Sequence, residues 1–152
     1  RHPNRNNKII SIIKKHNLSF KQRSKKQLPN KRTRIYLFDT FGETGLLMSI
    51  SNIIIVGGTL VPIGGHNLIE AGQFGKSIIV GPYIYKIEEI VNYFKKYKAI
   101  EILDKNDQLH RIINKLINNK KYTQKLNSNA KSSTLNFLNF SKIILKKIGN
   151  IK

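Results

Sequence analysis

Short apolar runs, separated by polar or glycine-rich turns, recur along the first two thirds of the chain. Residues 53–56 (Ile-Ile-Ile-Val) and 77–80 (Ser-Ile-Ile-Val) have the pattern of strands that are buried on both faces of a parallel sheet. Weaker strand patterns cover residues 18–23, 35–38 and 99–103. We therefore expect five strands.

Segments with helical spacing of apolar residues alternate with these runs. Residues 87–97 place Ile87, Ile90, Val91 and Phe94 on one face of a helix. Further helices are expected at residues 4–17, 42–51, 67–74, 107–118 and 122–148, the last of them broken. Alternating strands and helices predict an α/β fold with a Rossmann-like, mostly parallel sheet, and we take residues 1–150 as one domain.

Charge adds a basic surface to this fold. The chain has 28 Lys and Arg residues against 8 Asp and Glu, a net charge of +20, which is typical of nucleic-acid binders. The lysines are scattered, however, and the aromatic residues do not alternate with them as in a base-stacking surface. We attribute the charge to heavy use of Ile, Lys and Asn, and expect no specific nucleic-acid partner. A basic surface would still favour anionic membranes and phosphorylated lipids.

The composition excludes several kinds of site. The chain has no cysteine, so it has no disulfide, thiolate metal site or cysteine nucleophile. No apolar run approaches the roughly 20 residues of a membrane span. No pair of histidines has the spacing of zinc ligands, and no serine lies in a Gly-x-Ser-x-Gly turn. We therefore expect no metal and no cofactor.

Two glycine-bearing turns follow predicted strands, at the edge where parallel sheets bind ligands. In the first, Asp39-Thr40-Phe41-Gly42-Glu43, Thr40 and Glu43 have the spacing of a capping box, in which each side chain accepts from the other residue's amide. Gly42 would let a ligand approach the backbone closely. A plain helix start is the alternative interpretation.

The second turn, residues 57–70, has four glycines in its first nine residues, and Asn67 and Glu70 repeat the capping-box spacing. We expect the amides near Gly65 to Asn67 to bind a phosphate at a helix N-terminus, and Glu70 to accept from ribose hydroxyls. A glycine-rich turn with a plain cap is the alternative. The candidate phosphate loop consists of Thr59, Gly64, Gly65 and His66. We expect both turns to lie at one edge of the sheet.

In order and spacing, several segments resemble those of the Kdo (3-deoxy-D-manno-octulosonic acid) transferases. They are Arg1-His2-Pro3, Leu18-Ser19-Phe20 with Arg23-Ser24, Asp39 to Glu43, Val56 to Glu70, and Gly81-Pro82. The resemblance covers Arg1 to about Leu103, and the long glycine-rich motif is its most specific part. It implies the C-terminal, nucleotide-sugar-binding half of a GT-B glycosyltransferase. Such an enzyme moves Kdo from CMP-Kdo to a lipid A precursor (lipid IVA) in lipopolysaccharide biosynthesis, at the cytoplasmic face of the bacterial inner membrane.

The resemblance also implies which residues contact the nucleotide. The positions that match the family's CMP contacts are Arg1, Phe41, Gly42, Glu43, Asn67, Leu68, Ile69 and Glu70. The family's catalytic base, a Glu, belongs to the N-terminal half, so the catalytic residues stay unassigned here. The chain departs from the family at Phe41 (usually Met), Leu68 (usually Pro), Tyr83 (usually His) and Lys86-Ile87 (usually Asn-Phe).

The resemblance further implies a longer protein. In the family a hydrophobic strand precedes the segment that matches Arg1-His2-Pro3, and it is central in the Rossmann order. We therefore expect this chain alone to be poorly stable, with uncovered apolar surface, and inactive. Two alternatives stay open: a GT-B transferase that uses another nucleotide sugar, and a basic RNA-binding or inactive remnant.

Overall fold

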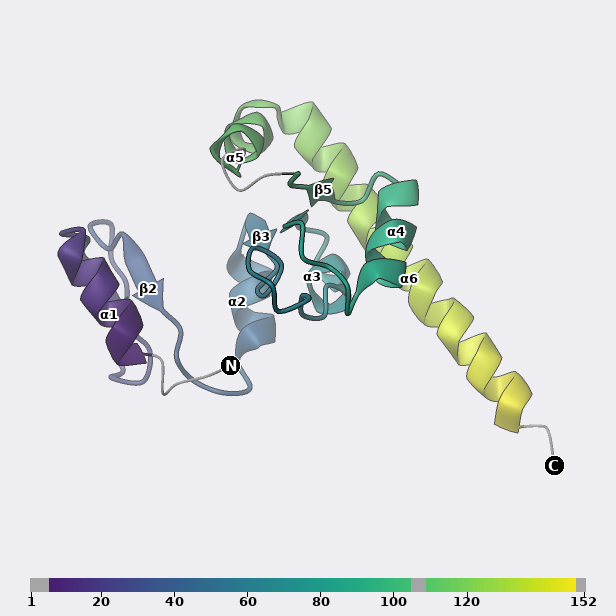
Figure 1. Cartoon of the computed structure of the whole chain (residues 1–152), viewed down its shortest axis with the longest axis horizontal. Coiled ribbons are helices and arrows are strands. Elements are labelled where there is room, and N and C mark those ends of the chain that lie inside the picture. Colours follow the sequence, from purple (N-terminus) through teal and green to yellow (C-terminus); the bar gives the residue numbers. More distant parts are fainter. Residues whose placement is uncertain (1–5, 105–108, 150–152) are drawn as a thin grey trace. The chain divides into compact units, whose positions relative to one another are not determined.

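The computed structural model describes residues 6–104 and 109–149, with side chains described as far as residue 139. The chain divides into two compact units, Arg1–Leu47 (unit 1) and Met48–Lys152 (unit 2). The division falls inside the short helix α2 (Thr44–Ile50) (Figure 1). Each unit is described by itself.

Unit 1 contains one helix and a two-stranded sheet. Helix α1 (Asn6–Lys15) buries Ile13 and ends on two lysines, where the helix dipole favours positive charge. Strands β1 (Phe20–Gln22) and β2 (Ile35–Leu37) pair in parallel, with Phe20 opposite Ile35. These elements confirm the predicted helix and strands; β1 is three residues shorter than expected and β2 is one residue shorter.

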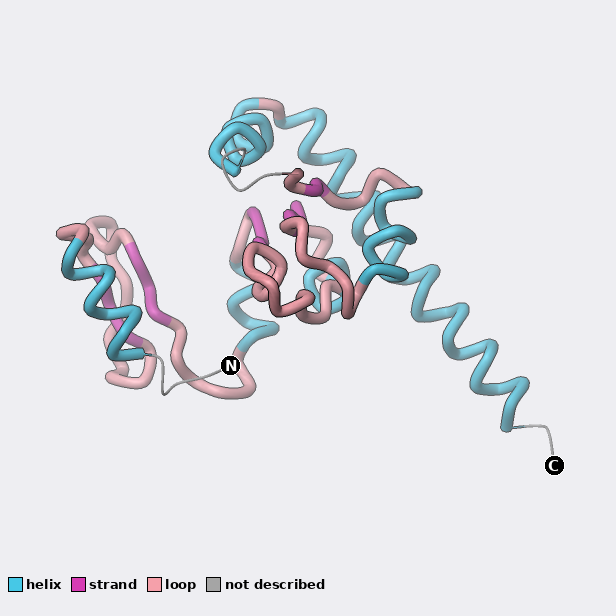
Figure 2. Tube along the Cα trace, viewed as in Figure 1, coloured by secondary structure: helices cyan, strands magenta, loops and turns pink. Residues whose placement is uncertain are grey.

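Unit 2 contains a three-stranded parallel sheet in the order β3-β4-β5. The strands are β3 (Ile53–Ile55), β4 (Ser77–Val80) and β5 (Glu101–Ile102), and Figure 2 shows how short they are beside the loops that follow them. Helix α3 (Ile69–Gln73) connects β3 to β4, and α4 (Glu88–Lys96) connects β4 to β5. Two helices follow, α5 (Leu109–Asn118) and α6 (Lys120–Gly149). The predicted alternation of parallel strands and helices is confirmed.

The core of unit 2 lies on both faces of β4, whose four residues are all buried. Ile78 and Val80 pack in one cluster, together with residues of α3, α4 and α6. Ile79 points to the opposite face and packs in a second cluster with Leu116 of α5 and Leu126 of α6. Helices therefore cover both faces of this sheet, and a fixed sheet holds the loops at its edge.

Two sequence expectations about these elements are wrong. Strand β3 is not buried on both faces: it is the outer strand of its sheet, and Ile55 is 39% exposed. Helix α6 is not broken, because neither proline nor glycine occurs between Lys120 and Gly149 (Figure 1). Within it, the Thr134 hydroxyl donates to the Ala130 carbonyl at 2.9 Å, a bond that a helix accommodates.

Among the residues that the structure describes, no helix is both long and apolar enough to cross a membrane.

Candidate functional site

The glycine-rich loop of unit 2 begins where β3 ends and is closed by its own backbone. The Gly65 amide donates to the Gly58 carbonyl at 2.9 Å, and the His66 amide donates to the Gly57 carbonyl at 3.1 Å. The loop therefore returns to its starting point before α3 begins. This places residues 66–70 at the carboxyl edge of the sheet, as the sequence predicts.

These same bonds correct the predicted phosphate loop. The amides of Gly65 and His66 already have acceptors in the loop, so of the three amides predicted to bind a phosphate only that of Asn67 is without an acceptor among the described residues. Gly64 and Gly65 have φ of +98° and +90°, and a Cβ on either would lie within 2.6 Å of Tyr85 or Ile87. Glycine is required there for backbone conformation and close packing.

Thr59 is also placed differently from the prediction. It is fully buried, and its hydroxyl donates to the Val56 carbonyl at 2.6 Å and accepts from the Gly81 amide at 2.8 Å. A hydroxyl with both roles filled and no exposed surface does not bind a phosphate. Thr59 is therefore part of the framework of the loop.

Helix α3 begins one residue later than a capping box at Asn67 and Glu70 requires. The Gly72 amide donates to the Leu68 carbonyl, which makes Leu68 the N-cap, and Leu68 provides no side-chain cap. The Asn67 side chain accepts from the Ile69 amide at 2.9 Å, and Glu70 lies in the first turn. The capping box is wrong, and among the residues that the structure describes no group is bonded to the Glu70 carboxylate.

The residues around α3 differ in what they can offer a ligand. The Leu68 side chain is fully buried in the core, so only its backbone is available. Within the described residues, the amides of Asn67 and Leu68 donate no hydrogen bond. Asn67 is exposed and Glu70 is half-buried. Loop backbone, an amide side chain and a carboxylate thus lie together at one strand end.

The capping box of unit 1 is wrong for the same reason. Helix α2 begins at Thr44, and the Glu43 carbonyl accepts the Leu47 amide at 3.2 Å, so Glu43 is itself the N-cap. The Thr40 hydroxyl donates instead to the Glu43 carboxylate. Phe41 is 73% exposed, and Gly42 has φ +78° with open space around it, since a Cβ added there would meet no atom within 4 Å. The turn therefore presents an aromatic side chain and an accessible backbone.

Arg23 is a partner of this turn that reasoning from the sequence did not identify. Its guanidinium forms a bidentate pair with Glu43, with Nη2 2.5 Å from Oε1 and Nε 3.2 Å from Oε2. The hydrogen bonds from Arg23 and then Thr40 lower the pKa of Glu43 to about 2. Glu43 is thus a fixed carboxylate, held from the end of β1. The only sequence signal was the Arg23-Ser24 pair within the resemblance.

Asp39 fixes the same region from the end of β2. Its carboxylate accepts from Asn6 at 2.7 Å and from Gln22 at 2.6 Å, and from both the amide and the hydroxyl of Ser24. Burial alone would raise the pKa of Asp39, but the bonds from Gln22 and Ser24 outweigh it and lower that pKa. Asp39 therefore joins α1, β1 and β2.

The pairing of Glu43 predicts a pH dependence. Because its pKa falls from an ordinary 4.5 to about 2 on folding, its stabilising contribution is complete above pH 4.5 and is lost as pH falls towards 2. We expect Glu43→Gln to make the free energy of unfolding fall less steeply across this pH range, as measured by urea unfolding. Glu88→Gln, at an exposed position in the first turn of α4, controls for the change in net charge. A slope equal to wild type would contradict the ion pair.

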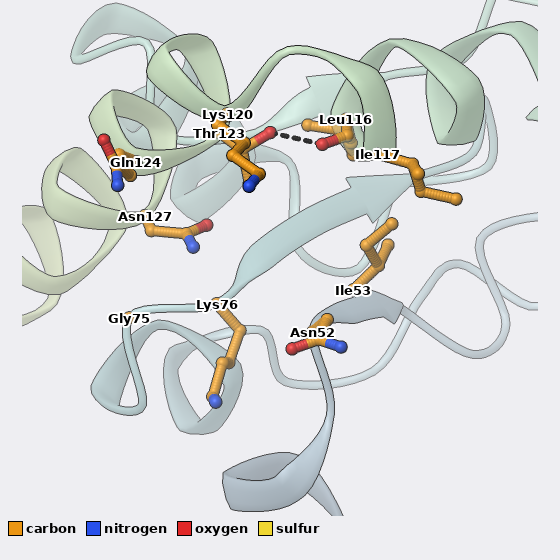
Figure 3. A pocket seen from close by; sticks show the side chains of 10 residues that line it. All are labelled: Asn52, Ile53, Gly75, Lys76, Leu116, Ile117, Lys120, Thr123, Gln124 and Asn127. Atoms are coloured by element: carbon orange, nitrogen blue, oxygen red, sulfur yellow. Dashed lines mark hydrogen bonds between the residues drawn. The ribbon is translucent and has the colours of Figure 1, made fainter.

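A separate hollow of about 440 Å³ lies at the opposite edge of the unit 2 sheet (Figure 3). Asn52, Ile53, Gly75 and Lys76 line it from the amino ends of β3 and β4, and residues of α5 and α6 complete it. Since the glycine-rich loop follows the carboxyl ends of the strands, this hollow is not part of the predicted site. The described residues also contain no group of three His, Asp or Glu side chains that could hold a metal ion.

The predicted nucleotide contacts therefore fall into two described groups. Phe41, Gly42 and Glu43 lie together in unit 1, and the four residues from Asn67 to Glu70 lie together in unit 2. Arg1 lies outside the described residues. That both turns share one edge of a single sheet stays a prediction.

The chain is similar to a family of known proteins and to several curated members. The sequence matches the family of Glycosyl transferases group 1 over residues 1–133. The 3-deoxy-D-manno-octulosonic acid transferase of Haemophilus influenzae is 35% identical over 127 residues, which make up 83% of this chain and 30% of that protein. The transferase of the same name from Rickettsia felis is 39% identical over 113 residues, 74% of this chain and 24% of that protein.

A solved structure is similar over nearly the whole chain. The crystal structure of the C-terminal CMP-Kdo binding domain of WaaA from Acinetobacter baumannii matches with a TM-score of 0.84 and 30% identity, over 88% of this chain and 69% of that chain. This similarity confirms the predicted Rossmann-like fold class and the resemblance to Kdo transferases. The chain spans less than a third of the length of the two curated relatives. Because the family match covers residues 1–133, the chain belongs to the group 1 glycosyl transferases.

Proposed function

We propose that this chain is the donor-binding part of an enzyme that transfers Kdo from CMP-Kdo to a lipid A precursor in lipopolysaccharide biosynthesis. The observation that supports this most directly is the similarity to a domain described as CMP-Kdo binding, at a TM-score of 0.84. The curated relatives named as Kdo transferases support the same donor. The acceptor, lipid IVA, and the cytoplasmic face of the inner membrane follow from the resemblance.

In this proposal, the residues around α3 bind the nucleotide. The Glu70 carboxylate accepts hydrogen bonds from the ribose hydroxyls, which are donors, so the pairing is chemically matched. Asn67 and Leu68 supply backbone amides that have no acceptor among the described residues, and Ile69 continues the contact surface. Phe41, Gly42 and Glu43 of unit 1 are proposed as further CMP contacts, with Glu43 held in place by Arg23.

A basic surface suits the substrates of such an enzyme. The donor and the lipid A precursor carry anionic groups, and a net charge of +20 attracts anionic ligands and anionic membranes. No metal or cofactor is part of the proposal, and the catalytic base is expected in the N-terminal half of the intact protein.

Nucleotide selectivity tests the proposal against a transferase for another nucleotide sugar. Calorimetric titration of the intact protein with CMP, UMP, AMP and GMP should give binding to CMP at least about tenfold tighter than to the others, a difference of about 1.4 kcal/mol. Equal affinity for UMP, or preference for a purine nucleotide, would overturn the assignment of the donor.

RNA binding tests the alternative of a basic remnant. We expect the intact protein to bind RNA only non-specifically, with Kd of about 10⁻⁴ to 10⁻⁶ M at physiological salt and a steep loss as salt rises. Filter binding with two unrelated RNAs of equal length measures both properties. Nanomolar, sequence-selective binding together with no affinity for CMP would favour the remnant.

A further inference from the structure

Thr59 connects the ends of two neighbouring strands through one buried hydroxyl. The hydroxyl donates to the carbonyl of Val56, the residue after β3, at 2.6 Å. It accepts the amide of Gly81, the residue after β4, at 2.8 Å. Because Thr59 is 0% exposed, no water replaces these bonds, and removing the hydroxyl would leave a buried amide without an acceptor.

Backbone bonds extend this connection along the two loops, which lie side by side (Figure 2). The Thr59 carbonyl accepts the Tyr83 amide at 3.0 Å, and the Gly64 carbonyl accepts the Lys86 amide at 3.1 Å. A Cβ on Gly81 would lie 2.2 Å from the Thr59 carbonyl oxygen, so the two backbones meet at a distance that only glycine permits. The glycine-rich loop is thus fixed against the loop that follows β4.

The far end of the glycine-rich loop leads directly to the proposed nucleotide contacts. Backbone bonds between Gly57–Gly58 and Gly65–His66 close the loop, and Leu68, which is fully buried, anchors its end in the core. Asn67 and Glu70 flank that anchor. The loop that Thr59 holds therefore leads into Asn67 and Glu70, although Thr59 itself has no surface with which to touch a ligand.

We propose that Thr59 is a positioning residue for nucleotide binding, acting through its hydroxyl, and that the bare backbone of Gly81 is required for it to do so. The proposal rests on the proposed function, because it assigns Thr59 to the site that binds CMP. Thr59 therefore does not bind the phosphate itself; it acts from a buried position, through its hydrogen bonds to the two loops.

The test uses two variants of the intact protein, which separate the effect of losing the Thr59 hydroxyl from the effect of changing the shape of the side chain. Thr59→Val keeps the shape and removes the hydroxyl, whereas Thr59→Ser keeps the hydroxyl and removes a methyl group. Ile78→Val is the matched control for stability, since it removes one methyl group from the fully buried centre of β4 and changes no hydrogen bond of the loop. CMP affinity is measured by calorimetry well below each melting temperature, and exchange of the Gly81 amide is followed by mass spectrometry or NMR.

We expect Thr59→Val to bind CMP about tenfold more weakly than wild type, in line with the loss of a buried hydrogen bond. It should also lose protection of the Gly81 amide. Thr59→Ser and Ile78→Val should keep both properties near wild type. If wild type binds CMP and Thr59→Val binds it equally well, Thr59 contributes stability alone and the inference is wrong. If wild type does not bind CMP, the proposed function and this inference fail together.

Discussion

Replacing Gly81 by alanine is expected to destabilise the protein by about 1–3 kcal/mol or more. The added Cβ would lie 2.2 Å from the Thr59 carbonyl oxygen and 2.6 Å from its carbonyl carbon. Both are backbone atoms of Thr59. They are held in place because the Thr59 hydroxyl accepts from the Gly81 amide and the Thr59 carbonyl accepts from the Tyr83 amide. Relief therefore requires movement of the backbone, and overpacking of this kind typically costs about 1–3 kcal/mol and sometimes more.

Gly57→Ala is the matched control for Gly81→Ala. Gly57 lies in the glycine-rich loop, and its φ is not positive. A Cβ added to Gly57 would meet only the His66 side chain, at 3.2 Å. A side chain can shift by a few tenths of an ångström, so we expect a change below about 1 kcal/mol. Urea unfolding of both variants gives the comparison. Equal stability of Gly81→Ala and Gly57→Ala would show that the two loops are not held as closely as described.

Glu70→Gln is expected to weaken CMP binding by about tenfold or more. The substitution keeps the size of the side chain and removes the charge that strengthens a hydrogen bond from a ribose hydroxyl. Hydrogen bonds to charged groups contribute about 1.5–3 kcal/mol, and 1.4 kcal/mol corresponds to a factor of ten in affinity. Calorimetric titration of the intact protein with CMP measures the difference.

Substitutions at Glu70 should affect CMP binding much more than the free energy of unfolding. Since Glu70 is not a capping residue, Glu70→Ala should change the free energy of unfolding by no more than the roughly 0.3–1 kcal/mol of a charge in the first turn of a helix. Glu89→Gln, in the first turn of α4, removes the same charge elsewhere in unit 2 and should leave CMP affinity unchanged. If Glu70→Gln binds CMP as tightly as wild type, the ribose assignment is wrong.

Both capping boxes were misplaced because their sequence signature does not define where a helix begins. Thr40 and Glu43, like Asn67 and Glu70, have the required spacing, but α2 and α3 begin one or more residues later than the box demands. At Glu43, an arginine twenty residues earlier competes for the carboxylate and binds it. At α3, Leu68 is buried in the core, and the Asn67 side chain accepts the amide of Ile69 instead of that of Glu70. In neither helix do the predicted capping side chains have the partners that a capping box requires.

The fold class was easier to predict than the roles within the loop. Alternation of apolar runs and helical segments requires only local patterns, and the structure confirms parallel strands with helices on both faces of the sheet in unit 2. Four glycines in nine residues suggested an anion site, because glycine permits close approach of a ligand. In the structure, Gly64 and Gly65 are approached by Tyr85 and Ile87 instead. The residues next to a glycine in the sequence do not show whether a ligand or another part of the protein packs against it.

The most direct test of the proposed function is transfer of Kdo itself. The intact protein is incubated with CMP-Kdo and lipid IVA, and the lipid product is analysed by mass spectrometry, with release of CMP measured in parallel. We expect the lipid to gain the mass of one or more Kdo residues and CMP to be released in equal amount, while Glu70→Gln gives less product at low donor concentration. A wild-type protein that is folded and binds CMP, but leaves lipid IVA unchanged, would contradict the assignment as a Kdo transferase.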